Sequence, residues 1–291
     1  MRYPILFAAV AACLCLAQDK PQILDIKTSK LPNGLELVLS EDHSRPVVNL
    51  QVWYHVGSKD ERAGRTGFAH LFEHMMFRGS RNLGPEEHFR LVNRAGGNVN
   101  AYTTFDQTVY WETIPPNYLE QMMWAESDRM SSLVINKEIL DKEREVVKEE
   151  RRMRYDNPPY GLLMERLLDN FYQVYPYKHM PIGSMDDLNK ASAADVQQFF
   201  DTFYVPNNAT VVVVGDFDSK QAAAWAAKYF GPIPRSKNPV PRVTVKEPAQ
   251  AALRSLDAAL PNAPIPAVAK TYHIPGAGDP DLYALEIAST I

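Results

Sequence analysis

The stretch TGFAHLFEHMMFRGS, residues 66–80, places two histidines and a glutamate inside an apolar segment. Its apolar side chains recur at the i, i+3, i+4, i+7 spacing of one helix face. His70, Glu73 and His74 repeat that spacing on the adjoining face. The segment therefore predicts an amphipathic helix that carries three chemically versatile side chains beside a buried stripe.

Two interpretations of this pair of histidines have to be weighed. Residues four apart on a helix have Cβ atoms about 5–6 Å apart, so His70 and His74 can both reach one zinc ion at about 2.0–2.1 Å. Glu73 is poorly placed as a further ligand beside His74, and it fits better as the base that acts on a water molecule at the metal. The alternative is a pair of hydrogen-bonded core histidines, since burial favours a neutral imidazole in either case.

The neighbouring segments predict a mixed architecture around this helix, for which Thr66 is the expected N-cap and Gly79 the expected C-terminal glycine. The dipeptide Asn33-Gly34 is typical of a hairpin turn. Strand patterns occupy 35–42, 47–57, 98–115 and 208–217, and helical patterns occupy 84–97, 117–133, 136–159 and 189–204. Because strands, helices and strands follow one another, we expect an α+β fold with a mixed, largely antiparallel sheet covered by helices.

A third zinc ligand is expected in a charged helical segment, DKEREVVKEERRM, residues 141–153. Glu143 and Glu150 lie seven apart and share one face of that helix, and four basic residues near them balance their charge: Arg144, Lys148, Arg151 and Arg152. The usual meaning of such a run is a solvated helix with surface ion pairs. From these residues alone, the solvated helix is the better interpretation.

Several motifs together resemble one peptidase family. His70-Leu71-Phe72-Glu73-His74 has the inverted form H-x-x-E-H, which is similar to the zinc motif of the pitrilysin, insulinase and mitochondrial-processing-peptidase family. The resemblance extends over about residues 31–291 and includes three further segments: GRTGFAHLFEHMMFRGS, NAYTTFDQTVYWETIP and YVPNNATVVVVGDFD.

The resemblance implies roles for individual residues. In that family a glutamate about 70–77 residues beyond the motif completes the metal site, and Glu150 stands 76 positions after His74. A supporting glutamate seven residues earlier corresponds to Glu143. The implied protein is a metalloendopeptidase with one Zn²⁺ per chain, in which Glu73 activates water and Glu143 assists from outside the ligand set.

The resemblance also implies how a substrate binds. Asn100 and Ala101 would pair through their backbone with an extended peptide beside the zinc, so the expected partner is a peptide or an unfolded polypeptide. Members of the family close a chamber between two homologous halves. An alternative function is therefore a zinc-binding but non-catalytic or incomplete subunit, which needs a homologous partner chain or a C-terminal half for activity.

A proline-rich linker at 236–243 separates two expected domains. Residues 24–235 would form the N-terminal zinc peptidase domain. In residues 244–291, the segment KTYHIPGAGDPDLYALEIASTI weakly repeats a strand, a polar loop and a helix start, but without the paired histidines. We expect a duplicated, processing-peptidase-like architecture in which this second, non-catalytic copy is truncated.

The N-terminus has the features of an export signal. A basic start at Arg2 precedes the apolar run 5–16, and cleavage after Ala17 would remove residues 1–17 as a signal peptide. The competing interpretation is a lipoprotein attached through Cys13. Both cysteines lie in this segment, so zinc in the mature chain must be held by nitrogen and oxygen.

The composition limits the other partners of the mature chain. Removing Arg2 from the 31 Lys and Arg residues leaves 30 against 35 Asp and Glu, a formal charge of −5. This balance gives no electrostatic reason to expect a nucleic-acid partner. We also expect no transmembrane segment in the mature chain, and a periplasmic or secreted location.

Overall fold

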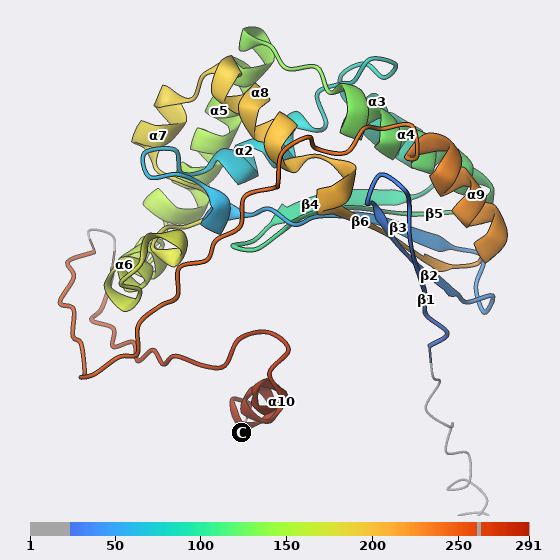
Figure 1. Ribbon diagram of the computed structural model, residues 1–291. Coiled ribbons are helices and arrows are strands. Elements are labelled where there is room, and N and C mark those ends of the chain that lie inside the picture. Colours follow the sequence, from blue (N-terminus) through green and yellow to red (C-terminus); the bar gives the residue numbers. More distant parts are fainter. Residues whose placement is uncertain (1–23, 261–262, 291) are drawn as a thin grey trace, which may run out of the picture.

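The computed structural model describes residues 24–260 and 263–290, and its centre is one six-stranded sheet (Figure 1). The strand order across the sheet is β1-β2-β6-β3-β5-β4. The strands are β1 (Lys27–Lys30), β2 (Glu36–Glu41), β3 (Val48–Tyr54), β4 (Asn98–Thr103), β5 (Thr108–Ile114) and β6 (Ala209–Gly215). The predicted signal peptide, with Cys13, lies outside the described residues.

The sheet is mixed but mostly antiparallel, as expected from the sequence. Only β2 and β6 pair in parallel, and the other four neighbouring pairs are antiparallel. The turn between β1 and β2 contains Gly34 at φ +96°, a left-handed conformation that glycine adopts without steric cost. β6, the last strand in the sequence, lies in the middle of the sheet between β2 and β3. Its alternate residues, Ala209, Val211 and Val213, are buried.

Figure 1 shows the helices gathered on one face of this sheet. They are α2 (Phe68–Met75), α3 (Glu87–Arg94), α4 (Leu119–Ser132), α5 (Lys137–Arg151), α6 (Leu163–Phe171), α7 (Met185–Lys190), α8 (Ala193–Phe203) and α9 (Ser219–Tyr229). Alternate side chains of the strands point into this layer and are buried, whereas their neighbours on the other face are partly exposed. The predicted α+β fold, a sheet covered by helices, is confirmed.

The helix predicted over 189–204 begins later in the structure, as α8 at Ala193. Its first two residues, Asn189 and Lys190, instead end a separate helix, α7, which the sequence did not predict. The break has a local cause, because Ser192 caps α8 by accepting a hydrogen bond from the Asp195 amide. The Asp195 carboxylate in turn accepts from the Ser192 amide at 3.2 Å.

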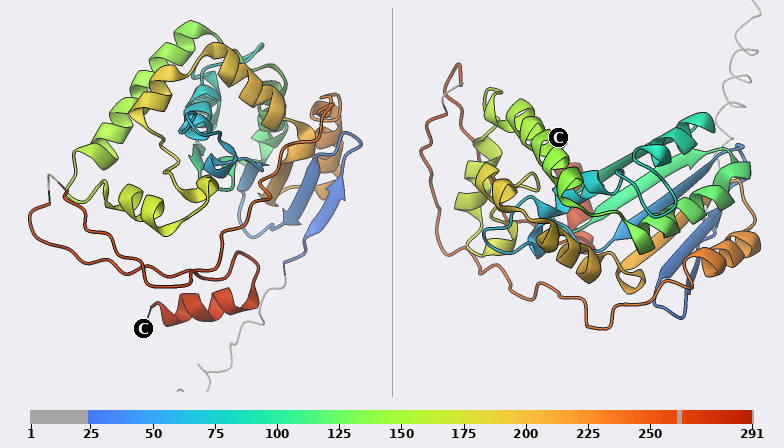
Figure 2. Two further views of the ribbon diagram at one scale, coloured as in Figure 1. Left: turned by 60° about the vertical axis from the view of Figure 1, so that its left-hand side comes forward. Right: turned by 90° about the horizontal axis from the view of Figure 1, so that it is seen from above.

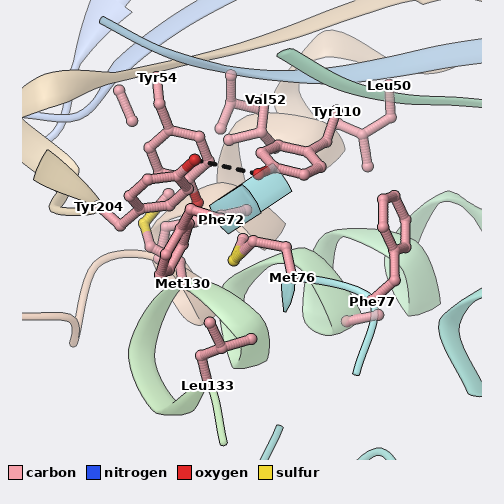
Figure 3. Close-up of a cluster of buried hydrophobic side chains, with 14 of the residues drawn as sticks. Leu50, Val52, Tyr54, Phe72, Met76, Phe77, Tyr110, Met130, Leu133 and Tyr204 are labelled. Carbon is pink, nitrogen blue, oxygen red and sulfur yellow. Dashed lines mark hydrogen bonds between the residues drawn. The ribbon is translucent and has the colours of Figure 1, made fainter. Parts of the chain in front are cut away.

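An aromatic cluster holds α2 against the sheet (Figure 3). The Tyr110 and Tyr204 hydroxyls lie 3.1 Å apart, and the Tyr54 ring lies 4.2 Å from that of Tyr204. Phe72 of α2 inserts beside them, with its ring 4.2 Å from Tyr204. Phe72 is buried on this side of α2. His70, two residues earlier, therefore lies on roughly the opposite side of the helix, away from this cluster.

Residues 234–260 and 263–279 contain no helix or strand, and Figure 2 shows them as extended traces that lead to α10 (Pro280–Ala288). The strand expected near residues 270–275 is wrong, since a strand needs a neighbour for its backbone groups and no described segment pairs with it. The domain limits therefore stay predictions. Among the described residues, no helix is long and apolar enough to cross a bilayer.

Candidate metal centre

The start of α2 differs from the sequence prediction. Its N-cap is Gly67, at φ +85°, and not Thr66. The Thr66 hydroxyl instead donates to Asp187 at 2.7 Å, and the free amides at the helix start donate to the buried carboxylate of Glu61. Glycine is required at 67, because a Cβ there would lie 2.7 Å from the Ile182 carbonyl oxygen.

The three predicted ligands come together between α2 and α5, which pack against each other. One ligand atom from each of His70, His74 and Glu150 lies within 4.8 Å of the other two. Glu150 Oε2 is 3.6 Å from His70 Nε2 and 3.3 Å from His74 Nε2. Two imidazoles and one carboxylate are a donor set that suits zinc and leaves room for a fourth ligand. The residues present therefore fit the metal.

The electrostatics of the site also suit a cation. Burial, with the neighbouring His74, lowers the pKa of His70 to about 4, so its ring is neutral and ready to bind a metal. Burial alone would lower the pKa of His74, but the neighbouring carboxylates of Glu143 and Glu150 raise it to about 9. The proximity of His74 lowers the pKa of Glu150. The His74 ring thus stands between two carboxylates, and a metal ion bound at Nε2 would displace the proton from that nitrogen.

Glu143 lies behind His74, as its position in the helix predicts. Its Oε2 is 3.7 Å from His74 Nδ1, on the side of the ring opposite Glu150. Arg78 fixes Glu143 with an Nε contact of 2.7 Å, and Arg154 pairs with Glu150 at 2.9 Å. A carboxylate in this place selects the histidine tautomer and orients the ring.

Arg78 and Arg154 were missed by sequence reasoning, which assigned the balancing charge to other basic residues. Arg144, Lys148, Arg151 and Arg152 instead pair with acids elsewhere on or near α5. Arg78 gave no signal, because its contact with α5 becomes visible only after folding. Arg154 lies four residues after Glu150, a helical spacing that could have indicated this pair. The C-terminal end of α2 is likewise different, since its C-cap is Met76 and the expected Gly79, at φ +114°, follows three residues later.

Glu73 faces a cavity of about 900 Å³ that also exposes the three ligand residues. Its Oε2 accepts a hydrogen bond from the Thr103 hydroxyl at 2.5 Å. Burial raises the pKa of Glu73 above its ordinary value. A carboxylate whose proton affinity is increased and whose position is fixed can act as a general base at neutral pH. The lining of the cavity also includes five large apolar or aromatic side chains: Phe105, Tyr155, Met164, Leu168 and Met180.

Asn100 and Ala101 line the same cavity from β4. This strand is at the end of the sheet order and pairs only with β5 among the described strands. The Ala101 amide donates to the side-chain oxygen of Asn100 at 2.9 Å. An exposed edge of this kind can accept another extended chain, which would take over that amide.

A second cluster of His and Glu lies in the core between β5, α3 and α4. His88, Glu112 and Glu126 are all buried, and one ligand atom of each lies within 4.8 Å of the others. Arg129 binds both oxygens of Glu126 and lies over the Tyr110 ring at 4.5 Å from its centroid. None of the four lines the cavity beside α2. Sequence reasoning made no prediction for them.

Comparison with known proteins agrees with the motifs. The family model described as Insulinase (Peptidase family M16) matches residues 36–183, and the model of the Peptidase M16 inactive domain matches residues 190–291. The chain belongs to peptidase family M16. The family resemblance predicted from the H-x-x-E-H motif is therefore confirmed.

Two of the relatives are named as a zinc protease and a probable zinc protease. The chain is 34% identical over 263 residues to the zinc protease PqqE of Helicobacter pylori, covering 90% of this chain and 59% of that protein. It is 34% identical over 238 residues to the probable zinc protease PqqL of Escherichia coli, covering 76% of this chain and 25% of that protein. The crystal structure of a protease from Helicobacter pylori matches with TM-score 0.75 and 35% identity, over 78% of this chain and 55% of that one. The chain thus spans less than two thirds of the length of these relatives.

Proposed function

We propose that this chain is the metal-binding part of an exported zinc endopeptidase. His70, His74 and Glu150 hold one Zn²⁺, Glu73 is the general base, and Glu143 orients His74. The observation that carries the proposal is the convergence of these ligand atoms within 4.8 Å of one another in the cavity that Glu73 also faces. The names of PqqE and PqqL as zinc proteases support both the metal and the reaction.

The chemistry that zinc supplies when bound in such a site is the activation of a water molecule and the polarisation of a carbonyl group. The Glu73 carboxylate would accept the proton of the attacking water as its oxygen adds to the peptide carbonyl, and the resulting carboxylic acid would give the proton to the leaving amine. The hydroxyl of Thr103 holds Glu73 in place during both transfers. Glu143 keeps Nε2 of His74 directed to the metal by its position at Nδ1.

The substrate is a peptide or an unfolded polypeptide that adds to the edge strand β4. Asn100 and Ala101 offer backbone groups at the cavity, and such pairing recognises an extended chain more than a particular sequence. A folded protein has few free extended segments, so it would be a poor substrate. The apolar side chains in the lining support contacts with large apolar side chains of the substrate.

A second candidate is a zinc-binding chain that is inactive by itself. It is favoured by one observation, that the chain spans 59% of PqqE and 25% of PqqL. In this case a further homologous half or partner chain would complete the substrate chamber. Export is supported by the predicted signal peptide and by the description of the solved Escherichia coli PqqL as a periplasmic protease.

The test is Glu73→Gln, which keeps the size of the side chain and removes its basicity. We expect about one zinc per chain to remain and cleavage of a fluorogenic peptide to fall by about 10² to 10⁴-fold. Glu145→Gln is the matched control, because Glu145 is an exposed acid on α5 whose ion-pair partner among the described residues is Lys148. Full peptidase activity in the Glu73 variant would refute the base. A parent chain that binds zinc but cleaves nothing until a longer chain is supplied would favour the second candidate.

A further inference from the structure

The proposed ligands come from two helices that are far apart in the sequence. α2 supplies His70 and His74, and α5 supplies Glu150. Metal–ligand distances tolerate only about ±0.2 Å, so such a site depends on how firmly the two helices hold their separation. A third segment, residues 179–191, contacts both of them. We name it the bridging segment.

The bridging segment holds the carboxylate that caps α2. His179 Nε2 lies 2.9 Å from Glu61 Oε2. That carboxylate accepts hydrogen bonds from the amides of Gly67 at 3.0 Å and Ala69 at 2.8 Å, which are free donors at the start of the helix. The His179 ring is fixed by stacking on Tyr175, with centroids 5.0 Å apart. Since Glu61 is buried, losing its third partner would loosen the first turn of α2.

A second group of contacts lies one step further along the bridging segment. Asp187 accepts hydrogen bonds from the amide and the hydroxyl of Thr66 at 3.1 and 2.7 Å, and the Ser184 amide donates to that hydroxyl at 3.0 Å. Gly183 packs directly on Gly67, because a Cβ on Gly183 would lie 2.4 Å from the Gly67 Cα. The turn that leads into α2 is therefore pressed against this segment without intervening side chains.

The same segment is bound to α5. Arg151, the residue after Glu150, donates to the Gly183 carbonyl oxygen. Arg144 donates to the carbonyl oxygens of Leu188 at 2.9 Å and Ala191 at 2.5 Å. These three carbonyl groups belong to the bridging segment, and both arginines belong to α5. One short stretch of chain thus joins the helix of the histidines to the helix of the glutamate.

We propose that the bridging segment sets the spacing between α2 and α5 and thereby the affinity of the site for zinc, with His179 and Arg144 as positioning residues. The inference rests on the proposed zinc site. Neither residue lies in the ligand set, and each acts through backbone or carboxylate groups that fix a ligand-bearing helix. Outer partners of metal ligands change metal affinity by about 10–100-fold when removed, and the same scale applies to these contacts.

The test measures zinc dissociation constants by competition with a chromogenic chelator. His179→Ala removes the donor to Glu61, and we expect its dissociation constant to rise by about 10–100-fold. His179→Gln restores an N–H donor and should bind zinc within about threefold of the parent. Asn33→Ala is the matched control for lost stability, because Asn33 donates buried hydrogen bonds to Phe230 and Ile233 away from the cavity. Zinc affinity should be unchanged in that variant.

A second variant, on the α5 side of the bridging segment, tests the inference even if His179→Ala does not fold. Arg144→Met removes both hydrogen bonds to the bridging segment from α5, and we expect about a tenfold rise in the dissociation constant. Equal zinc affinity in the parent, the His179 variant and the Arg144 variant would overturn the inference, as would an equal loss in Asn33→Ala. His70→Ala distinguishes a failure of the proposed zinc site from a failure of the proposed role of the bridging segment. If it binds zinc like the parent, the zinc site itself is wrong, whereas its failure to bind zinc beside an unaffected His179→Ala rejects only the bridging role.

Discussion

Two clusters in this chain have almost the same composition and opposite surroundings. One contains His70, His74 and Glu150, and the other contains His88, Glu112 and Glu126. In each, the ligand atoms lie within 4.8 Å of one another. The first opens onto the 900 Å³ cavity, and the second is closed within the core.

The clusters differ in the group that balances their negative charge. In the core cluster, Arg129 binds both oxygens of Glu126 and already occupies the place of a cation. Burial, with repulsion from Glu126, raises the pKa of Glu112 well above its ordinary value, which favours the protonated form of this carboxyl group. In the open cluster, Arg154 binds only one oxygen of Glu150, and the other faces the two imidazoles. The proximity of ligand atoms is therefore not enough to indicate a metal site, and charge and access decide between the two.

Removing one histidine from each cluster tests most directly which of the two clusters binds zinc. His74→Ala should reduce bound zinc from about one per chain to close to none, because only one imidazole and one carboxylate remain. His88→Ala should keep about one zinc per chain and lose stability instead. Elemental analysis of the dialysed proteins, together with circular dichroism to confirm folding, measures both. Zinc lost from the His88 variant and kept by the His74 variant would assign the metal to the core.

The fold and the open cluster were largely predictable because both depend on local periodicity. Alternating residues in β3 and β5 identify strands, and the helical spacing of residues 68–76 directs His70 and His74 to one face. The distance from His74 to Glu150 adds a family pattern that no local rule supplies. These features could be predicted because each depends on residues within one helix or strand, or on a known spacing between motifs.

The remaining features depend on contacts between elements. Gly67 is the N-cap of α2 because Ile182 and Gly183 press against it, and nothing in the local sequence distinguishes it from Thr66 as a cap. Arg78 becomes a partner of Glu143 only when α2 packs on α5. The core cluster was invisible for the same reason, because its residues lie on three separate elements. Glu112 in β5 would even be predicted to be exposed, because burying a carboxylate is unfavourable unless it has partners.

Removing the internal cation of the core cluster should have the next largest effect. Arg129→Met leaves the buried Glu126 without its counter-charge and also removes the contacts of the guanidinium with the Phe77 and Tyr110 rings. We expect the free energy of unfolding to fall by about 3–5 kcal/mol, measured by urea denaturation of the metal-free protein. The double variant Glu126→Gln with Arg129→Met should recover part of this loss, because the unpaired charge is gone. A loss below about 1 kcal/mol, the usual value of an exposed ion pair, would show that the cluster is hydrated.

The smallest expected effect tests the proton on Glu112. The folded chain keeps this proton at pH values where the unfolded chain, with an ordinary pKa near 4.5, has lost it. Since the folded state binds more protons, the contribution of Glu112 to stability falls as pH rises above about 4.5, by at most about 1.4 kcal/mol per pH unit. Glu112→Gln cannot titrate, so the stability of the parent relative to this variant should decrease from pH 5 to pH 6 in urea denaturation experiments, by at most about 1.4 kcal/mol. Titrating groups that do not interact with Glu112 cancel in that difference. A difference that stays constant over this range would mean that Glu112 is ionised in the fold, and the core cluster would then have the uncompensated charge that a cation site requires.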